Sequence, residues 1–308
     1  MSVTIDKLRY FAVLAEELNF TRAASRVFMT QQAFSVHIRQ LEVWVGTPLF
    51  ERAPRGVELT PAGAQLIGPV REALETLDAG LEELRALGGV HRPLRIGGTP
   101  FGGGELITAV LDLFRAEHPD IVLEMWETRL EDPTSGLHGG LVDLAFVRPP
   151  IDLEGLVVRE LFSEPIVLCV SSQHPLAEAS AVTLEQAVAE PLVIARKTTP
   201  EWDDFWLLCQ QRGGRPRVGA SAGSILEELE TVAAGSAATF FPASGARLYM
   251  HHGIRFLPII DGPVSTVALA WRDKGLSIAA RAFIDVVERV VTTEVDLMDA
   301  LRAGRPAG

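Results

Sequence analysis

Residues 21–42 read TRAASRVFMTQQAFSVHIRQLE, and this stretch decides the fold of the first part of the chain. Small and apolar residues from Ala23 to Phe28 predict a short helix, which Thr21 could cap. Thr30 is placed to cap a second helix that begins at Gln31. On the second helix, apolar residues recur every three or four positions and predict one buried face, made of Ala33, Phe34, Ile38 and Leu41. A short helix, a tight turn and a second helix with a polar outer face are typical of a helix-turn-helix.

The segments on both sides of this pair complete a small domain. Residues 4–18 predict a first helix with Thr4 as its cap, and Gly46 is placed to end the long helix. Residues 49–52 and 57–60 then predict two short strands, a wing whose tip presents Arg52 and Arg55. Arginines on a projecting loop suit contacts to phosphate or to the minor groove, although a solvated hairpin with incidental charge has the same pattern.

From Pro61 the sequence predicts one long helix that ends before Gly88-Gly89. Proline is favoured at a first helical position. The helix carries a narrow apolar seam with three- and four-residue spacing, formed by Leu66, Val70, Leu74, Leu77, Leu81 and Leu84. We predict that the seam pairs with a second copy of the chain. The alternative is a long helix packed on its own domain.

Composition narrows the class of protein. The 308 residues carry a net charge of −12, but residues 1–60 hold seven basic and six acidic side chains, so the acidic excess lies in the rest. An acidic remainder would repel DNA and confine contact to the N-terminal part. The two cysteines, Cys169 and Cys209, indicate inert thiols in a reducing compartment. With no long apolar run and no leader-like N-terminus, we expect a cytoplasmic protein.

From Leu94 onward, short apolar strands alternate with helices, which predicts an α/β region with parallel sheets. One of these helices is expected over residues 202–212. We predict two subdomains, with the chain crossing between them near residues 161–165 and 262–266. A cleft between them would be the ligand site, because ligands of open α/β folds bind at the carboxyl ends of the strands. Trp126 and Trp202 are expected to pack in the core or at the hinge.

Residues 5–65 closely resemble the N-terminal domain of the LysR-type transcriptional regulators. The resemblance rests on the run 20–28, on Leu41-Glu42, on Gly46, on PLFER at 48–52 and on LTPAG at 59–63. The remainder is similar to the family's effector-binding domain, through LRIGG, LFRAEHPDIVLE, LVDLAFVR, HPLA at 174–177 and GSAATFFPAS at 235–244. The resemblance implies an all-α winged helix-turn-helix domain, a linker helix and an α/β, periplasmic-binding-protein-like domain with two subdomains.

The resemblance also fixes expected boundaries and partners. The DNA-binding domain would span residues 1–60 and the linker helix residues 61–89. The effector domain would span 90–308, with subdomain I at 90–162 and 266–295 and subdomain II at 163–265. The implied partners are double-stranded promoter DNA, a small-molecule effector and further copies in a homotetramer that bends its DNA, and RNA polymerase is a further candidate.

The DNA contacts are transferred residue by residue. Gln31 suits adenine in the major groove, Ser35 can reach a base or phosphate, and Thr30 with the helix N-terminus can hold a phosphate. The sequence departs from the family at Gln32, where proline is frequent, and at Val36, where a basic residue is frequent, so the operator sequence does not transfer. The full predicted set is Thr21, Arg22, Thr30, Gln31, Gln32, Ser35, His37, Arg39, Arg52 and Arg55.

For the effector, the family's contact positions fall on the loop after the first strand and on loops that face the hinge. In this chain they are Thr99, Pro100, Phe101, Thr128, Arg148, Arg196, Thr198, Thr199 and Ser221, with Phe240 as a wall. Thr99, helix-start amides and the two arginines favour a small organic anion. The alternative for Arg148 and Arg196 is an ion pair with a neighbouring carboxylate.

Two other classes of function compete with this interpretation. An enzyme on the same fold is disfavoured, because GGTPFGGG has neither G-x-G-x-x-G nor G-K-[ST] spacing and Ser221–Ser224 lacks a nucleophile elbow. Adjacent His251 and His252 point in different directions, so no metal site or cofactor is predicted. The third class is an architectural DNA-binding protein that has lost its ligand.

Overall fold

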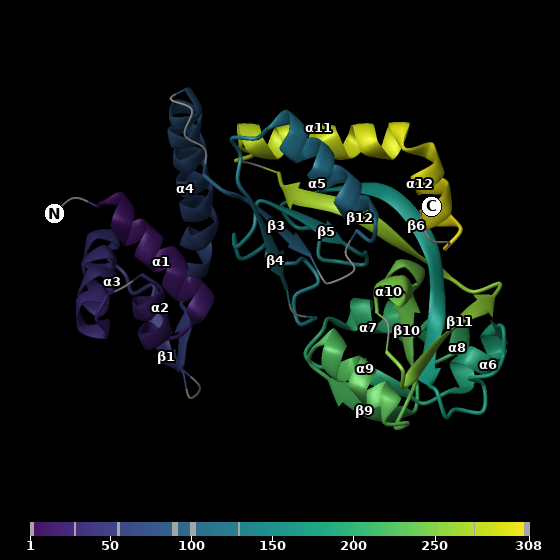
Figure 1. Cartoon of the computed structure of the whole chain (residues 1–308). Coiled ribbons are helices and arrows are strands. Elements are labelled where there is room, and N and C mark those ends of the chain that lie inside the picture. Colours follow the sequence, from purple (N-terminus) through teal and green to yellow (C-terminus); the bar gives the residue numbers. More distant parts are fainter. Residues whose placement is uncertain are drawn as a thin grey trace. The chain divides into compact units, whose positions relative to one another are not determined.

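A computed structural model describes residues 3–27, 29–53, 56–87, 92–98, 103–128, 130–249, 251–273 and 275–304. The side chains of residues 52, 53, 56, 75, 79, 82, 83 and 85–87 are not part of this description. The chain forms two compact units, residues 1–90 and 91–308 (Figure 1). Among the described residues, no helix is both long and apolar enough to cross a bilayer.

The first unit begins with three helices, α1 (Ile5–Glu17), α2 (Phe20–Arg26) and α3 (Gln31–Val45). The Oγ1 atom of Thr30 accepts a hydrogen bond from the backbone N–H of Ala33, so the predicted cap of α3 is confirmed. The predicted cap of α2 is wrong. Asn19 caps this helix by accepting from the N–H groups of Thr21 and Arg22, because an asparagine stands one residue before the first turn.

The wing consists of β1 (Phe50–Ala53) and β2 (Gly56–Leu59), antiparallel with Phe50 opposite Leu59. Glu42 joins it to α3, because one carboxylate oxygen accepts hydrogen bonds from the N–H groups of Leu49 (2.8 Å) and Phe50 (3.2 Å). Two backbone donors on one carboxylate fix the direction in which the strand leaves the helix. The wing therefore has a defined position relative to α3.

The long helix α4 (Pro61–Leu87) follows the wing. The core of the first unit contains Phe11, Leu14, Phe34 and Leu41, and α4 contributes the buried Val70, with Leu66 and Leu74 packed against it. Arg9 on α1 and Asp78 on α4 form a two-point ion pair beyond this core. The first half of α4 thus belongs to the core of the first unit.

The second unit is built on a mixed sheet. Its strand order is β4-β3-β5-β12-β6-β11-β7, with β10 also paired to β6. Strands β3, β4 and β5 are parallel, but β12 is antiparallel to both β5 and β6. The prediction of parallel sheets is therefore correct for β3, β4 and β5 and wrong for β12. It failed because β6 and β12 run between the subdomains and return, which strand–helix alternation does not reveal. The bounds are β3 (Leu94–Gly98), β4 (Leu123–Glu127), β5 (Leu144–Val147), β6 (Leu156–Ser171) and β12 (Val264–Arg272).

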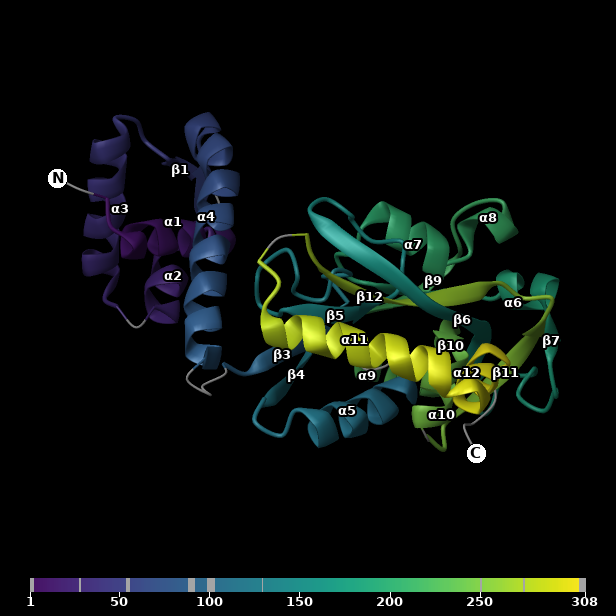
Figure 2. The same ribbon diagram turned by 90° about the horizontal axis from the view of Figure 1, so that it is seen from above.

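The first subdomain packs its helices on one face of the sheet. Figure 2 shows α11 lying along this face with α5 beside it. Phe114 of α5 and Phe283 of α11 meet with ring centroids 5.2 Å apart in the largest apolar core. The helices are α5 (Leu106–Glu117), α11 (Ile278–Thr293) and α12 (Val295–Arg302).

The second subdomain surrounds the far end of β6. That strand pairs with β12 up to Pro165 and with β10 and β11 from Ile166 onward, so one unbroken strand belongs to both subdomains. The predicted helix over residues 202–212 is divided at Leu208, whose φ of +49° ends the first helix. The remaining elements are β7 (Val182–Thr183), α6 (Leu184–Ala189), β8 (Leu192–Ala195), α7 (Pro200–Trp206), α8 (Cys209–Arg212), β9 (Val218–Ala222), α9 (Ile225–Ala233), β10 (Thr239–Pro242), α10 (Ala243–Leu248) and β11 (Ile254–Ile260).

Candidate functional site

A groove on the first unit lies between α2, α3 and the wing. Four of the predicted DNA contacts line it, namely Thr21, Gln31, Ser35 and Arg39. Thr21 comes from the first turn of α2, and the other three lie at four-residue spacing on α3 and therefore share one face. Glu42 and Glu51 also line the groove, and the two glutamates place negative charge beside the polar row. The geometry brings these four side chains together on one surface.

The other predicted DNA residues differ in their surroundings. Gln32 and Thr30 are exposed beside the groove. The guanidinium of Arg22 donates to the side chain and carbonyl of Glu17. The His37 ring lies 5.2 Å from the Tyr10 ring, so it packs on α1 as well as reaching the surface. Arg55, and the side chain of Arg52, lie outside the described residues.

The leucine seam of α4 divides into two parts. Val70 is 4% exposed in the core of its own unit, and Leu66 and Leu74 pack on the same core. Val70 is therefore buried within one copy, whereas Leu66 and Leu74 are only partly buried there. Farther along the helix, Leu81 is 40% exposed and Leu84 is 66% exposed. The second half of α4 thus presents apolar side chains that its own unit does not cover.

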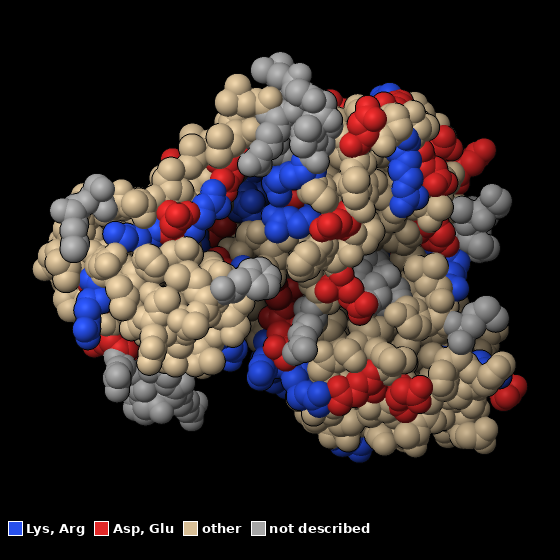
Figure 3. Space-filling view, turned by 60° about the vertical axis from the view of Figure 1, so that its left-hand side comes forward, with Lys and Arg blue, Asp and Glu red and all other residues tan. Residues whose placement is uncertain are grey.

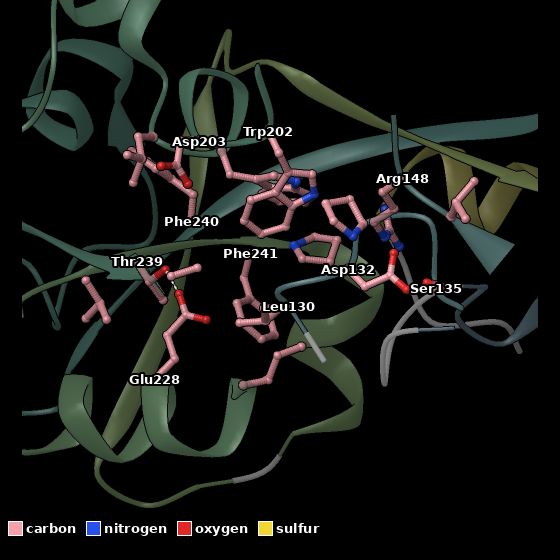
Figure 4. A pocket seen from close by; sticks show the side chains of 18 of the residues that line it. Leu130, Asp132, Ser135, Arg148, Trp202, Asp203, Glu228, Thr239, Phe240 and Phe241 are labelled. Carbon is pink, nitrogen blue, oxygen red and sulfur yellow. Dashed lines mark hydrogen bonds between the residues drawn. The ribbon is translucent and has the colours of Figure 1, made fainter. Parts of the chain in front are cut away.

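The second unit contains a pocket between its two subdomains, shown in Figure 4. Its walls are mostly apolar and aromatic. The first subdomain contributes Leu130, Asp132, Pro133, Ser135 and residues 146–148. The second contributes Val193, Ala195, Trp202, Asp203, Trp206, Leu207, Ile225, Glu228 and residues 239–242. Of the predicted effector residues, Arg148 and Phe240 line this pocket. It has the character of a small-molecule site, an apolar cavity with a few polar groups.

Arg148 is tied into a buried network at the end of the pocket. Its guanidinium donates to the carboxylate of Glu164 at 2.6 Å and to the hydroxyl of Ser265 at 2.8 Å. Glu164 is fully buried and also accepts from the N–H (2.5 Å) and hydroxyl (2.7 Å) of Ser244. Burial lowers the pKa of Arg148, and the Glu164 carboxylate opposes that fall. The charge of Arg148 is therefore balanced inside the protein.

Arg196 is also paired. Its guanidinium donates to both oxygens of Glu227, at 3.0 and 2.7 Å, and to the backbone carbonyl of Ser221. All three residues are exposed. On the face of the second unit seen in Figure 3, acidic and basic side chains lie next to one another. The ion-pair alternative thus holds for both arginines. The charge on which the prediction of an organic anion depended is already neutralised.

The remaining predicted effector residues have local structural roles or lie outside the description. Thr199 caps α7 by accepting from the N–H of Trp202, and the Thr198 hydroxyl donates to Asp203. The buried hydroxyl of Thr128 has no hydrogen-bond partner among the described residues. Thr99, Pro100 and Phe101 lie outside those residues. None of these side chains is among those that line the pocket.

Sequence reasoning missed several pocket residues. Trp202 both packs on the core and lines the pocket, whereas Trp126 is 42% exposed on β4, so the expectation of buried packing is wrong for Trp126. Trp206 and Glu228 were not singled out, because an amphipathic helix explains both equally well. The turn at Asp132 is held by hydrogen bonds that its carboxylate accepts from the N–H groups of Thr134 and Gly136.

Burial strongly affects one carboxyl group in the pocket. Burial raises the pKa of Glu228 to about 7, and a hydrogen bond from the Thr239 hydroxyl acts in the opposite direction. The buried Ser135 hydroxyl and Trp206 indole N–H have no hydrogen-bond partner among the described residues. Within the residues that the structure describes, no cluster of three or more histidine, cysteine and acidic side chains is placed to hold a metal ion.

Comparison with known proteins identifies the family. Residues 5–64 match the model of the bacterial regulatory helix-turn-helix protein, lysR family, and residues 87–292 match the LysR substrate binding domain. YnfL of Escherichia coli, an uncharacterized HTH-type transcriptional regulator, is 32% identical over 98% of this chain and 100% of its own length. AlsR of Bacillus subtilis, an HTH-type transcriptional regulator, is 33% identical over 79% of this chain and 81% of its own.

Solved structures show the same fold. Full-length OxyR of Pseudomonas aeruginosa aligns with a TM-score of 0.64 at 24% identity, covering 95% of this chain and 96% of that one. CbnR, solved in complex with its target DNA, aligns with a TM-score of 0.59 at 21% identity, covering 93% and 99%. The chain therefore belongs to the LysR family of transcriptional regulators, with a DNA-binding helix-turn-helix domain followed by a substrate-binding domain.

Proposed function

We propose that the groove between α2, α3 and the wing is the surface that reads operator DNA. One observation carries this proposal: Gln31, Ser35 and Arg39 lie in a row on one face of α3 and line the same groove. A helix with such a row fits the major groove, where glutamine can bond to adenine and arginine to guanine. Thr21, Arg22, Thr30, Gln32 and His37 would contact the DNA around this row, and Arg52 and Arg55 of the wing would contact the adjacent groove.

Replacing Gln31 by alanine should lower the preference for the operator by about 1–3 kcal/mol, the cost of one lost bidentate base contact. Binding to random DNA should change little, because phosphate contacts remain. The measurement is competition between the protein's own upstream intergenic DNA and random DNA. Gln40→Ala is the matched control, since Gln40 lies on α3 but does not line the groove. Equal loss on both DNAs in the Gln31 variant would contradict the base contact.

We infer that two copies pair through the exposed end of α4. Leu77 is partly exposed, and Leu81 and Leu84 lie farther along the same helix at three- and four-residue spacing with more of their surface open. Apolar side chains at this spacing are buried when two helices pack together. Such pairing would give a two-fold dimer for a roughly palindromic operator, and a dimer of dimers is the assembly that we propose.

Replacing Leu84 by glutamate should disrupt this pairing, because a charge would be buried between the helices. The mass measured by light scattering should fall by half or more, and operator binding should weaken at the same protein concentration. Leu153→Glu is the control, because Leu153 is similarly exposed (59%) but lies outside α4. An unchanged mass for the Leu84 variant would show that copies associate elsewhere.

We propose that a small molecule in the pocket between the subdomains controls DNA binding. The Ser135 hydroxyl and the Trp206 N–H have no hydrogen-bond partner within the described parts of the chain. This favours a ligand over an architectural protein with an empty domain, since buried polar groups are normally satisfied. A ligand acts only if its affinity differs between two arrangements of the protein. We propose a regulator without catalytic activity, acting in the cytoplasm on promoter DNA, with RNA polymerase as a further partner.

A further inference from the structure

We infer that the pocket between the subdomains recognises an organic ammonium ion with an apolar body. This inference rests on the proposed role of the pocket as the effector site. It reverses the charge expected from the sequence. Three observations support it: the carboxyl group of Glu228, the aromatic walls of the pocket, and the ion pair between Arg148 and Glu164.

The charges around the pocket are unequal. Among the lining residues that the structure describes, three carry carboxyl groups, Asp132, Asp203 and Glu228, and one carries a positive charge, Arg148. Because Arg148 is paired with the buried Glu164, it does not offset these carboxylates. Figure 4 shows Arg148 with Asp132 and Ser135 at one end, and Glu228 with Thr239 at the other. An anion entering the cavity would therefore meet acidic groups.

Glu228 differs from the other two carboxyl groups. The carboxylate of Asp132 accepts hydrogen bonds from Thr134 and Gly136. Asp203 accepts from Thr198 and lies 3.8 Å from a guanidinium nitrogen of Arg215. Glu228 accepts from Thr239 alone among the described residues, and a cation is not among the groups that act on its pKa.

The surroundings of Glu228 favour a cationic ligand, because the described residues place no cation against its carboxyl group. Glu228 extends from α9 beside the buried thiol of Cys169 on β6. Burial and the charge of Glu228 both raise the pKa of this thiol. The Glu228 side chain is half-buried, and a carboxylate withdrawn from water is costly unless it is paired. A ligand ammonium group placed against the oxygen that does not bond to Thr239 would supply that pair and up to three hydrogen bonds.

The walls suit the rest of such a ligand. Trp202 and Trp206 lie with ring centroids 5.7 Å apart, and Phe240 and Phe241 form the facing strand. Aromatic faces attract cations, and this attraction strengthens where water is excluded. Leu130, Val193 and Ile225 complete an apolar surface for a carbon skeleton. The site thus combines the Glu228 carboxyl group, which has no cationic partner among the described residues, with an aromatic and aliphatic enclosure.

The test compares three probes of similar size that differ in charge. These are 2-phenylethylammonium, 2-phenylethanol and 3-phenylpropionate, each titrated into the full-length protein and followed by calorimetry and thermal shift. The ammonium compound should bind at least tenfold more tightly than the other two. Glu228→Gln should remove this preference, whereas Glu230→Gln, on the same helix but outside the pocket, should keep it.

The pH dependence of ligand affinity gives a second test. An ammonium ligand prefers the ionised carboxyl group, so its binding should release a proton and lower the pKa of Glu228. With a free-state pKa of about 7, affinity should rise about tenfold from pH 6 to pH 8, and Glu228→Gln should flatten the profile. A ligand that accepts a hydrogen bond from the protonated carboxyl group of Glu228 would show the opposite slope.

Three results would overturn the inference: binding of the carboxylate or alcohol as tight as that of the ammonium, no binding of any probe, or an unchanged preference in Glu228→Gln. Operator binding is measured on the same samples. Retained preference for operator over random DNA would leave the proposed regulator intact while the ligand class fails. Loss of that preference in the unmodified protein would count against the regulator itself.

Discussion

Replacing Glu164 by glutamine is expected to destabilise the second unit by about 3–5 kcal/mol, the cost of breaking a buried ion pair from one side. The shape of the side chain is kept, so the loss comes from charge. Arg148 would remain buried without the carboxylate that faces it, and the N–H of Ser244 would face a neutral amide. The measurement is urea unfolding followed by tryptophan fluorescence. It reports mainly on the second unit, which holds four of the five tryptophans, Trp126, Trp202, Trp206 and Trp271.

Two further variants test the cause. Glu185→Gln removes a carboxylate that is exposed on α6 and should change stability by less than about 0.5 kcal/mol. Replacing both partners, as Arg148→Met with Glu164→Leu, should recover much of the loss, because a well-packed apolar pair often equals or exceeds a buried ion pair. A single Glu164 variant as stable as the unmodified protein would show that the network contributes little.

Replacing Phe34 by alanine should cost the first unit about 3–5 kcal/mol, which is typical when a buried phenylalanine is truncated. Phe34 is fully buried, and its ring lies 5.7 Å from that of Tyr10 and 6.2 Å from that of Phe20. It therefore holds α3 against both α1 and α2. Operator binding should be lost, because the row of side chains on α3 no longer has a fixed position.

The control for this effect is chosen on the same helix. Val43 is 70% exposed on α3 and does not line the groove, so Val43→Ala should leave both stability and operator binding nearly unchanged. The tryptophan-monitored unfolding of the second unit should be the same in both variants. Operator binding that survives Phe34→Ala at 37 °C would mean that the first unit tolerates the cavity, and the packing argument for α3 would be wrong.

The sequence predicted the first unit well because its signals are local. Thr30 and Gly46 act at the ends of α3 as expected, and the buried face of that helix follows from residue spacing. The second unit was harder to predict. The antiparallel direction of β12 depends on a return across the hinge, and the break at Leu208 depends on a left-handed backbone in an otherwise helical pattern. Neither feature has a signal within a few residues.

The candidate site of the first unit was also easier to predict than that of the second. Gln31, Ser35 and Arg39 were found because one helix carries them at fixed spacing, and the groove brings them together. The pocket gathers residues from six or more separate segments, so sequence could not show that Glu164 pairs with Arg148 from across the hinge. The sequence also could not distinguish Glu228, which lines the pocket, from its neighbour Glu227, which pairs with Arg196.

The unbroken course of β6 through both subdomains determines how the pocket can change shape. A connection made of loops would let the two halves swing freely, but β6 keeps ladder partners on both sides of the crossing, β12 up to Pro165 and β11 and β10 from Ile166. Closure around a ligand must therefore twist a hydrogen-bonded strand. We therefore expect the two halves to differ by a small rotation between the arrangements with and without ligand, because the ladders on both sides of the crossing must stay paired.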